Sequence, residues 1–201
     1  MTAGARSEGA AAKARVRAAV IAARQGLPAP ERAAAASQLT AAVLSLPEVG
    51  AARTVALYSS IGTEPATTEL LDVLRSRDIT VLLPVVCDDL DLDWAIYAGR
   101  DLLSPTARGL WEPATPTLGV DAVSRADVVV VPALAVGADG TRLGRGGGCY
   151  DRALARVPAG RPVVALLYDG ELLPAVPAAP HDRRVTLVLT PSGAHRPAPP
   201  A

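Results

Sequence analysis

The segment ADVVVVPALAVGADGTRLGRGGGCYDRALARV, residues 126–157, joins a short apolar run to a glycine-rich stretch and then to a second stretch with apolar positions. Valine dominates the run over residues 126–131, which is typical of a buried strand. The glycines of residues 137–148 predict a loop, and residues 150–157 predict a short helix. A buried strand that leads through a loop into a helix is the building unit of α/β proteins with parallel sheets.

Outward from this segment, the chain continues to alternate between helices and strands. Residues 54–83 follow a strand–helix–strand order, which implies a parallel crossover. Residues 92–97 alternate as an edge or hairpin strand would, and residues 102–120 are rich in proline and glycine and predict a long functional loop. Helices are predicted at 10–25, 30–46 and 66–77, and further strands at 54–58, 79–83, 162–167 and 185–189.

These elements predict an α/β fold: a single three-layer α/β/α domain with a mostly parallel, Rossmann-like sheet. Ligands of such sheets bind beyond the carboxyl ends of the strands. The length of 201 residues fits one domain. We place this domain at residues 11–190, between a flexible N-terminal tail at 1–10 and a Pro-rich C-terminal tail at 191–201.

Composition excludes several classes of protein. The chain carries 20 Lys and Arg against 20 Asp and Glu, and this zero net charge argues against bulk electrostatic binding of nucleic acid. Its apolar runs are far too short to span a membrane, and the N-terminus lacks the apolar region of a signal peptide. The two cysteines, Cys87 and Cys149, fit a reduced cytoplasmic protein without a disulfide framework.

Residues 140–152, GTRLGRGGGCYDR, carry the clearest chemical signal. Glycines permit positive φ and a close approach of the backbone to a ligand, and successive N–H groups ahead of a helix can form an anion-binding nest. The guanidinium forks of Arg142 and Arg145 match phosphate oxygens, and Asp151 could hold a divalent metal beside such a phosphate. A flexible surface loop with incidental arginines is the alternative interpretation. The stretch is not a Walker loop, because it lacks the Gly-Lys-Ser/Thr sequence, and it is not a dinucleotide fingerprint, because Cys149 stands where the last glycine should be.

Residues 131–135, VPALA, together with residues 140–152 resemble the signature of 5-formyltetrahydrofolate cyclo-ligase, also called 5,10-methenyltetrahydrofolate synthetase. The order of flanking features agrees from Lys13 to Thr190. The resemblance implies an enzyme that uses ATP and Mg²⁺ to convert 5-formyltetrahydrofolate to 5,10-methenyltetrahydrofolate with release of ADP and phosphate. It implies no side-chain nucleophile, because phosphoryl transfer activates the formyl oxygen. We expect a cytoplasmic monomer with a small-molecule partner.

The same resemblance implies the site residues. Lys13 and Arg17, one helical turn apart, look like the family's basic pair that reaches the ATP phosphates, although the spacing alone also fits two solvated charges. ATP is further implied to contact Arg142, Leu143, Gly144, Arg145, Gly146, Gly147, Gly148, Cys149 and Tyr150, of which Arg145 and Tyr150 are the catalytic candidates. The folate is implied to contact Ser59, Glu64, Arg145, Gly146, Gly147, Gly148 and Cys149. Asp151 and Asp182 are the implied magnesium ligands.

Other residues keep two interpretations. Thr67 continues the folate-lining pattern three residues after Glu64, but both residues could instead cap a helix. Trp111 or Glu112 could line the folate site or simply pin their loop. The chain also departs from the family, which usually has Phe-Asp at positions 136–137 and commonly an aromatic residue at position 149. Two rival functions therefore stay open: an α/β protein that binds another phosphorylated ligand, and a folate-binding relative without catalytic activity.

Overall fold

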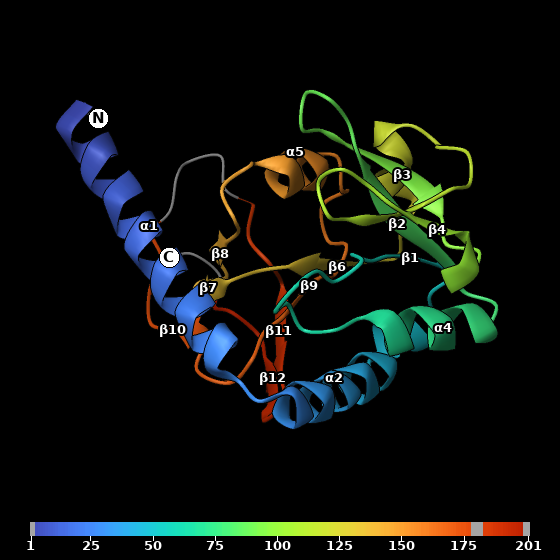
Figure 1. Cartoon of the computed structure of the whole chain (residues 1–201), viewed down its shortest axis with the longest axis horizontal. Helices are drawn as coiled ribbons and strands as arrows, with labels where there is room; N and C mark the ends of the chain where they lie inside the picture. The colour runs from blue at the N-terminus through green and yellow to red at the C-terminus, as the bar shows by residue number, and fades with distance from the viewer. Residues whose placement is uncertain (1–2, 178–182, 199–201) are drawn as a thin grey trace.

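The computed structural model describes residues 3–177 and 183–198, and its largest element is a seven-stranded sheet (Figure 1). From one edge to the other the sheet contains β12 (Gly193–His195), β11 (Leu187–Thr190), β9 (Val163–Leu166), β6 (Val128–Pro132), β1 (Thr54–Ala56), β2 (Thr80–Val86) and β3 (Leu92–Ile96). The five inner strands run parallel, and the two edge strands, β12 and β3, are antiparallel to their neighbours. The predicted mostly parallel sheet is confirmed.

Helices cover both faces of this sheet, so the predicted three layers are confirmed. One face carries α2 (Ala29–Leu44), α3 (Pro47–Gly50) and α4 (Thr68–Ser76), and the other carries α5 (Cys149–Ala155) and the 3-10 helix η2 (Val120–Arg125). Strand β6 shows why the valine-rich run at residues 126–131 requires helices on both faces of the sheet. Val128 and Val130 pack under the first set of helices, whereas Val129 and Val131 pack under the second. Side chains of a strand alternate between faces, so a run of valines is buried on both.

Two smaller sheets complete the fold. Strands β10 (Leu172–Leu173), β7 (Ala135–Gly137) and β8 (Arg142–Leu143) form one, and β4 (Leu103–Pro105) and β5 (Trp111–Pro113) form the other, just after the 3-10 helix η1 (Arg100–Leu102). Helix α1 (Ala3–Gly26) lies beside the first small sheet, where Val16 and Val20 pack on its apolar residues (Figure 1). Helix α1 therefore stands outside the three layers.

Several predicted boundaries were wrong at the ends of elements. Helix α1 begins at Ala3, so the residues 3–10 that we predicted as a loose tail are helical, although Gly4 and Gly9 have low helix propensity. The helix predicted at 30–46 ends at Leu44, and Pro47 occupies the first turn of a separate helix, α3, where its missing N–H costs nothing. Strand β12 lies inside the predicted tail from residue 191 and covers the exposed edge of β11.

Two predicted loops contain short strands. The segment 137–148 includes β8, which returns against β7 through a turn at Gly140, a glycine with φ of +85°. The segment 102–120 contains the β4–β5 hairpin. Within residues 3–177 and 183–198, we find no helix with the length and apolar character of a membrane span.

Candidate active site

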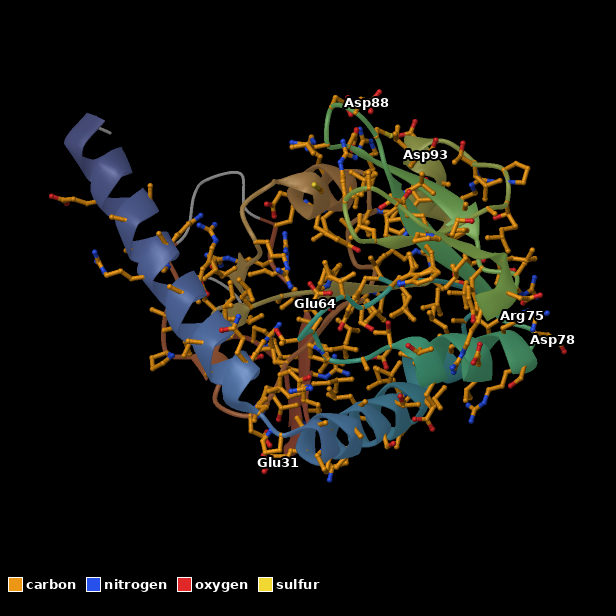
Figure 2. All side chains as sticks on the ribbon, viewed as in Figure 1. Glu31, Glu64, Arg75, Asp78, Asp88 and Asp93 are labelled. Atoms are coloured by element: carbon orange, nitrogen blue, oxygen red, sulfur yellow. The ribbon has the colours of Figure 1, made fainter. Side chains whose placement is uncertain are left out.

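A cavity of about 340 Å³ opens where β1, β2 and β6 end, at the carboxyl edge of the sheet. Its walls come from segments far apart in the sequence: α1, the chain after β1, the β2–β3 hairpin, residues 110–112, the chain after β6 and the glycine loop at 144–148. Figure 2 shows Glu64 near the centre of the molecule, whereas Asp88 and Asp93 lie at its rim. The acidic turn at 88–93 is therefore separate from Glu64.

The structure brings the predicted site residues together. All of those within the described part of the chain line this one cavity: Lys13, Arg17, Ser59, Glu64, Arg142, Leu143, Gly144, Arg145, Gly146, Gly147, Gly148, Cys149, Tyr150 and Asp151. Asp182, the second predicted metal ligand, lies outside the described residues.

The glycine loop needs its glycines for two different reasons. Gly146 and Gly148 have φ of +111° and +69°, a backbone conformation that residues with a Cβ rarely adopt. Gly144 and Gly147 do not have φ in this range. At Gly144 the reason is space, because an added Cβ would lie 2.7 Å from Nη1 of Arg142.

Arg142 anchors the loop from beneath. Its side chain is 4% exposed, and its Nη2 donates to Oδ1 of Asp151 at 2.7 Å while Nη1 donates to the carbonyl of Pro132 at 3.3 Å. Its guanidinium carbon lies 5.7 Å from the centre of the Tyr150 ring. The Nε atom of Arg142 is buried and makes no hydrogen bond with the part of the chain that the structure describes. Arg142 thus supplies a buried cation and one unused donor under the cavity.

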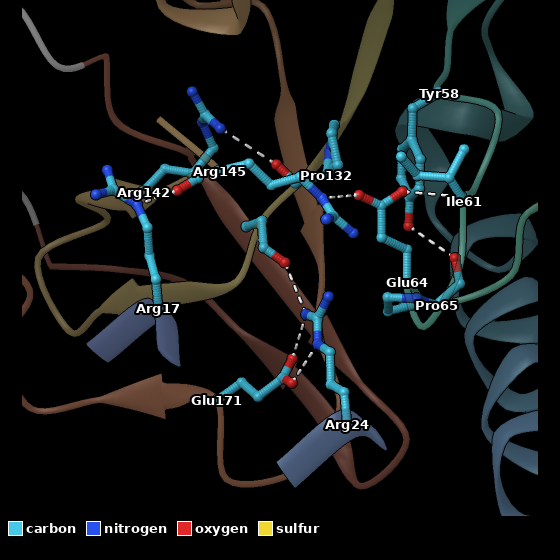
Figure 3. A network of polar contacts seen from close by, with 12 residues as sticks. Arg17, Arg24, Tyr58, Ile61, Glu64, Pro65, Pro132, Arg142, Arg145 and Glu171 are labelled. Carbon is cyan, nitrogen blue, oxygen red and sulfur yellow. Dashed lines mark hydrogen bonds and ion pairs between the residues drawn. The ribbon is translucent and has the colours of Figure 1, made fainter. Parts of the chain in front are cut away.

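Arg145 and Glu64 join opposite walls of the cavity (Figure 3). Nε of Arg145 donates to Oε1 of Glu64 at 3.0 Å, and the arginine side chain is 49% exposed while the glutamate is 9% exposed. The other oxygen of Glu64 accepts a hydrogen bond from the Ile61 backbone N–H at 3.0 Å. Because Glu64 is held by its own loop, it fixes the direction of the Arg145 side chain across the cavity.

Helix α1 reaches the loop through Arg17. Its Nε donates to the Gly144 carbonyl at 2.8 Å, and its guanidinium lies 3.6 Å from where a Cβ of Gly146 would stand. Lys13, one turn earlier, lines the same cavity. The spacing of four residues does place both cations on the helix face that meets the loop.

Two tyrosines near the loop stay protonated at neutral pH. Burial raises the pKa of Tyr150 well above its ordinary value, and the Glu64 charge raises it further against the opposing effect of Arg142. Burial and Glu64 likewise raise the pKa of Tyr58. Tyr150 can therefore act as a phenol but not as a phenolate base.

Three of the doubtful residues now have structural roles. The Thr67 hydroxyl donates to the Tyr58 carbonyl at 2.8 Å and accepts from the Ser60 N–H, so it joins the end of β1 to the start of α4. It makes no side-chain capping bond to α4. Glu112 accepts from the Val86 N–H at 3.0 Å and so pins its hairpin, while it also lines the cavity. Trp111 lines the cavity and is half exposed.

Sequence reasoning missed the apolar wall and one buried charge. Pro84, Val86 and Leu92 line the cavity, and the rule that ligands bind at carboxyl ends of strands could have found the first two.

Arg24, at the end of α1, is 1% exposed and pairs with Glu171. Burial by itself lowers the pKa of Arg24, but the hydrogen bonds and charge of Glu171 outweigh it and raise the pKa, so Arg24 stays a cation.

Comparisons with known proteins agree with this geometry. The sequence profile described as the 5-formyltetrahydrofolate cyclo-ligase family matches residues 9–191. The chain belongs to this family. A 5-formyltetrahydrofolate cyclo-ligase of Mycolicibacterium smegmatis is 45% identical over 144 residues, which is 69% of this chain and 74% of the relative. One from Escherichia coli K12 is 30% identical over 77% of this chain and 87% of the relative.

The fold agrees with the family as well. The solved structure of a 5,10-methenyltetrahydrofolate synthetase from Aquifex aeolicus superposes with a TM-score of 0.80 at 26% identity and covers 94% of each chain. The predicted cyclo-ligase resemblance, with its place in folate one-carbon chemistry, is thereby confirmed. Of the departures from the family pattern, only Cys149 lines the cavity; Val136 is fully buried in β7, and Gly137 follows it there.

Proposed function

We propose that this chain converts 5-formyltetrahydrofolate to 5,10-methenyltetrahydrofolate with Mg²⁺ and ATP, and releases ADP and phosphate. The Arg145–Glu64 pair carries this proposal. It joins the cationic wall of the cavity, suited to phosphates, to the wall of apolar and acidic residues, suited to a reduced pterin. One cavity thus offers a separate wall to each substrate, with Arg145 between the two walls.

The residues on the cationic wall fit a nucleoside triphosphate. Gly146 and Gly148 have positive φ, which an anion-binding nest of backbone N–H groups can use, and Arg17 and Lys13 line the same cavity from α1. Arg142 adds a buried cation with an unused Nε donor. These groups would hold the phosphates by charge-assisted hydrogen bonds, which are stronger than neutral ones.

The opposite wall fits the folate. Glu64 presents a carboxylate that can accept N–H groups of a pterin ring, and Ser59 lies in the same loop. Val86, Leu92 and Trp111 supply an apolar surface for the aromatic part of the substrate. Cys149 stands at the boundary of the two walls, where a small side chain leaves more room than an aromatic one would.

The chemistry needs no nucleophile from the protein. An amide-like formyl group is a poor electrophile, so the γ-phosphoryl group of ATP is transferred to the formyl oxygen, with ADP as the leaving group. The neighbouring folate nitrogen N10 then attacks the formyl carbon, loses its proton, and the former formyl oxygen departs within phosphate. Positioning and charge stabilisation are the protein's share of such a transfer. Arg145, whose Nε is bonded to Glu64, would turn its terminal Nη groups toward the transferring phosphoryl group. The Tyr150 phenol would donate a hydrogen bond.

Magnesium is part of the proposal. A hard cation prefers carboxylate oxygen and completes its shell with phosphates and water, and Asp151 at the start of α5 offers such a carboxylate. We propose that Asp151 holds the metal jointly with phosphate oxygens; within the described residues no cluster of three or more potential ligands is found. When bound, Mg²⁺ would neutralise charge on the phosphates. We propose Asp182 as the second ligand.

We also propose that the protein is a monomer and that its location is cytoplasmic. The proposed reaction is tested by mixing the purified protein with 5-formyltetrahydrofolate and Mg-ATP and recording the near-ultraviolet absorbance of the methenyl product. Product that forms only with ATP supports the cyclo-ligase. Tight folate binding without product supports a non-catalytic relative, and neither binding nor product supports another phosphorylated ligand.

Asp151→Asn should weaken the response to magnesium without unfolding the protein. Asparagine keeps an oxygen that can accept the hydrogen bond from Arg142 but loses the negative charge that a hard cation prefers. We expect the half-saturating Mg²⁺ concentration to rise about tenfold or more. It is measured from turnover at fixed ATP, with Asp72→Asn, a surface partner of Arg100, as the matched control. An unchanged magnesium titration would remove Asp151 from the metal site.

A further inference from the structure

Arg24 forms a buried polar network at the base of the cavity (Figure 3). Its Nε and Nη2 donate to the two oxygens of Glu171 at 2.6 and 2.7 Å, and Nη2 also donates to the Ala133 carbonyl at 2.7 Å. Its guanidinium carbon lies 5.5 Å from the centre of the Tyr168 ring. These four residues, called here the Arg24 network, join α1 to two other parts of the chain.

Each of those parts contributes to the cavity. Ala133 belongs to the segment after β6, where Pro132 and Leu134 are also cavity residues. Glu171 accepts from the Tyr168 N–H at 2.9 Å, which closes the turn between β9 and β10, and the Tyr168 hydroxyl donates to the Glu64 carbonyl at 3.4 Å. The Arg24 network therefore contacts the helix that carries Lys13 and Arg17, the cavity floor and the loop that carries Glu64.

Helix geometry links Arg24 to the two cations at the phosphate end. At 3.6 residues per turn, positions 13, 17, 20 and 24 fall on one face of α1, because their separations are four, seven and eleven residues. Val20 on this face packs on the small sheet, and Arg17 reaches Gly144. Arg24 is the most deeply buried side chain of that face.

We propose that Arg24 is a positioning residue for ATP: by its fork to Glu171 and Ala133 it sets the angle and register at which α1 presents Lys13 and Arg17 to the glycine loop. This inference rests on the proposed function, in which these two cations bind phosphates. Arg24 itself lies under the cavity floor and does not need to touch either substrate. A planar guanidinium can serve Glu171 and Ala133 together, whereas a lysine ammonium lacks that fixed geometry.

A buried ion pair is not by itself a reason for stability, since replacement by apolar residues is often neutral. The test must therefore separate the position of α1 from the stability of the whole protein. We would measure the dissociation constant for Mg-ATP by calorimetry, the melting temperature, and hydrogen exchange of α1 amides in the full-length protein. The variants are Arg24→Met and the milder Arg24→Lys, which serves alone if Arg24→Met does not fold.

Two controls match these variants. Val43→Ala removes packing on the far face of the sheet and lowers the melting temperature without touching α1. Arg161→Met breaks an Arg–Asp pair at the amino ends of the inner strands, away from the cavity at their carboxyl ends. There Asp127 accepts hydrogen bonds from the Arg53 and Thr54 backbone. Neither residue belongs to the cavity.

We expect Mg-ATP to bind at least tenfold more weakly to Arg24→Met, with a smaller loss for Arg24→Lys, and faster exchange confined to α1. Both controls should keep the wild-type affinity for Mg-ATP at a temperature where they are folded. Normal affinity in the Arg24 variants would overturn the proposal. So would an equal loss of affinity in Val43→Ala, because the effect would then follow stability alone. If wild-type protein binds Mg-ATP but forms no methenyl product, the proposed reaction fails, whereas the binding of ATP by Lys13 and Arg17, on which this inference depends, is still tested by the Arg24 variants.

Discussion

Replacing Arg145 by alanine is expected to lower turnover by about 10²-fold or more, the usual scale for one electrostatic stabiliser of a transition state, with little change in melting temperature. Arg145 joins the two walls of the cavity through Glu64, so its loss removes a cation from the place where the phosphoryl group is transferred. The Arg145 side chain is 49% exposed, and the Glu64 side chain, 9% exposed, keeps the hydrogen bond from the Ile61 N–H when Arg145 is removed, so we expect only a small loss of stability. Turnover and melting temperature are measured on the same variant.

The lysine variant and a matched arginine sharpen this test. Arg145→Lys keeps the charge but cannot bond Glu64 and a phosphoryl oxygen with one planar group, so we expect it to be clearly impaired. Arg100, an arginine of similar exposure that pairs with Asp72, lies outside the cavity, so Arg100→Ala should leave turnover unchanged. An Arg145→Ala protein that melts early and loses activity in proportion would make Arg145 structural. Full activity would remove the glycine loop from the chemistry.

Deletion of residues 1–18 is expected to raise the ATP concentration needed for half-maximal rate by roughly tenfold or more for each of the two cations lost, Lys13 and Arg17. Arg17 donates to the Gly144 carbonyl at 2.8 Å, and Lys13 lines the same cavity. The truncated chain keeps Arg24 and Val20, which retain the contacts at the end of α1. The melting temperature should change much less than the ATP requirement, although the packing of Val16 is lost.

The control for this deletion is a shorter one. Removing residues 1–8 leaves Lys13 and Arg17 in place and should change the ATP requirement little. The double variant Lys13→Ala/Arg17→Ala in the full chain should reproduce most of the effect of the long deletion. A 1–18 deletion with normal ATP dependence would mean that Lys13 and Arg17 are solvated charges that do not bind ATP.

The main sheet was predictable because its strands are buried on both faces. A run such as the valines of β6 can satisfy two apolar layers only as an inner strand, and glycine and proline mark where such runs end. The ends of the chain were less predictable. Alanine gives high helix propensity but no apolar stripe at residues 3–10, and β12 is only three residues long. Its pairing depends on the exposed edge of β11, which is a tertiary feature.

The candidate site was likewise predictable only in part. The glycine loop and its arginines follow from local chemistry, so their place in one cavity with Lys13 and Glu64 agrees with the interpretation of the motif. The Arg142–Asp151 and Arg145–Glu64 pairs did not follow, because opposite charges 9 and 81 residues apart carry no local signal of contact. Arg24 shares a helix face with Arg17, but its partner Glu171 lies 147 residues away.

The central claim is that the formyl oxygen receives the γ-phosphoryl group and leaves with it. The most direct measurement uses 5-formyltetrahydrofolate labelled with ¹⁸O in the formyl group, together with Mg-ATP and this protein in unlabelled water, and follows the label by mass spectrometry of the released phosphate. The account predicts one ¹⁸O atom in each phosphate and one phosphate for each methenyl product formed. Methenyl product accompanied by phosphate without the label would contradict it, because the formyl oxygen would then have left by a route that does not pass through ATP.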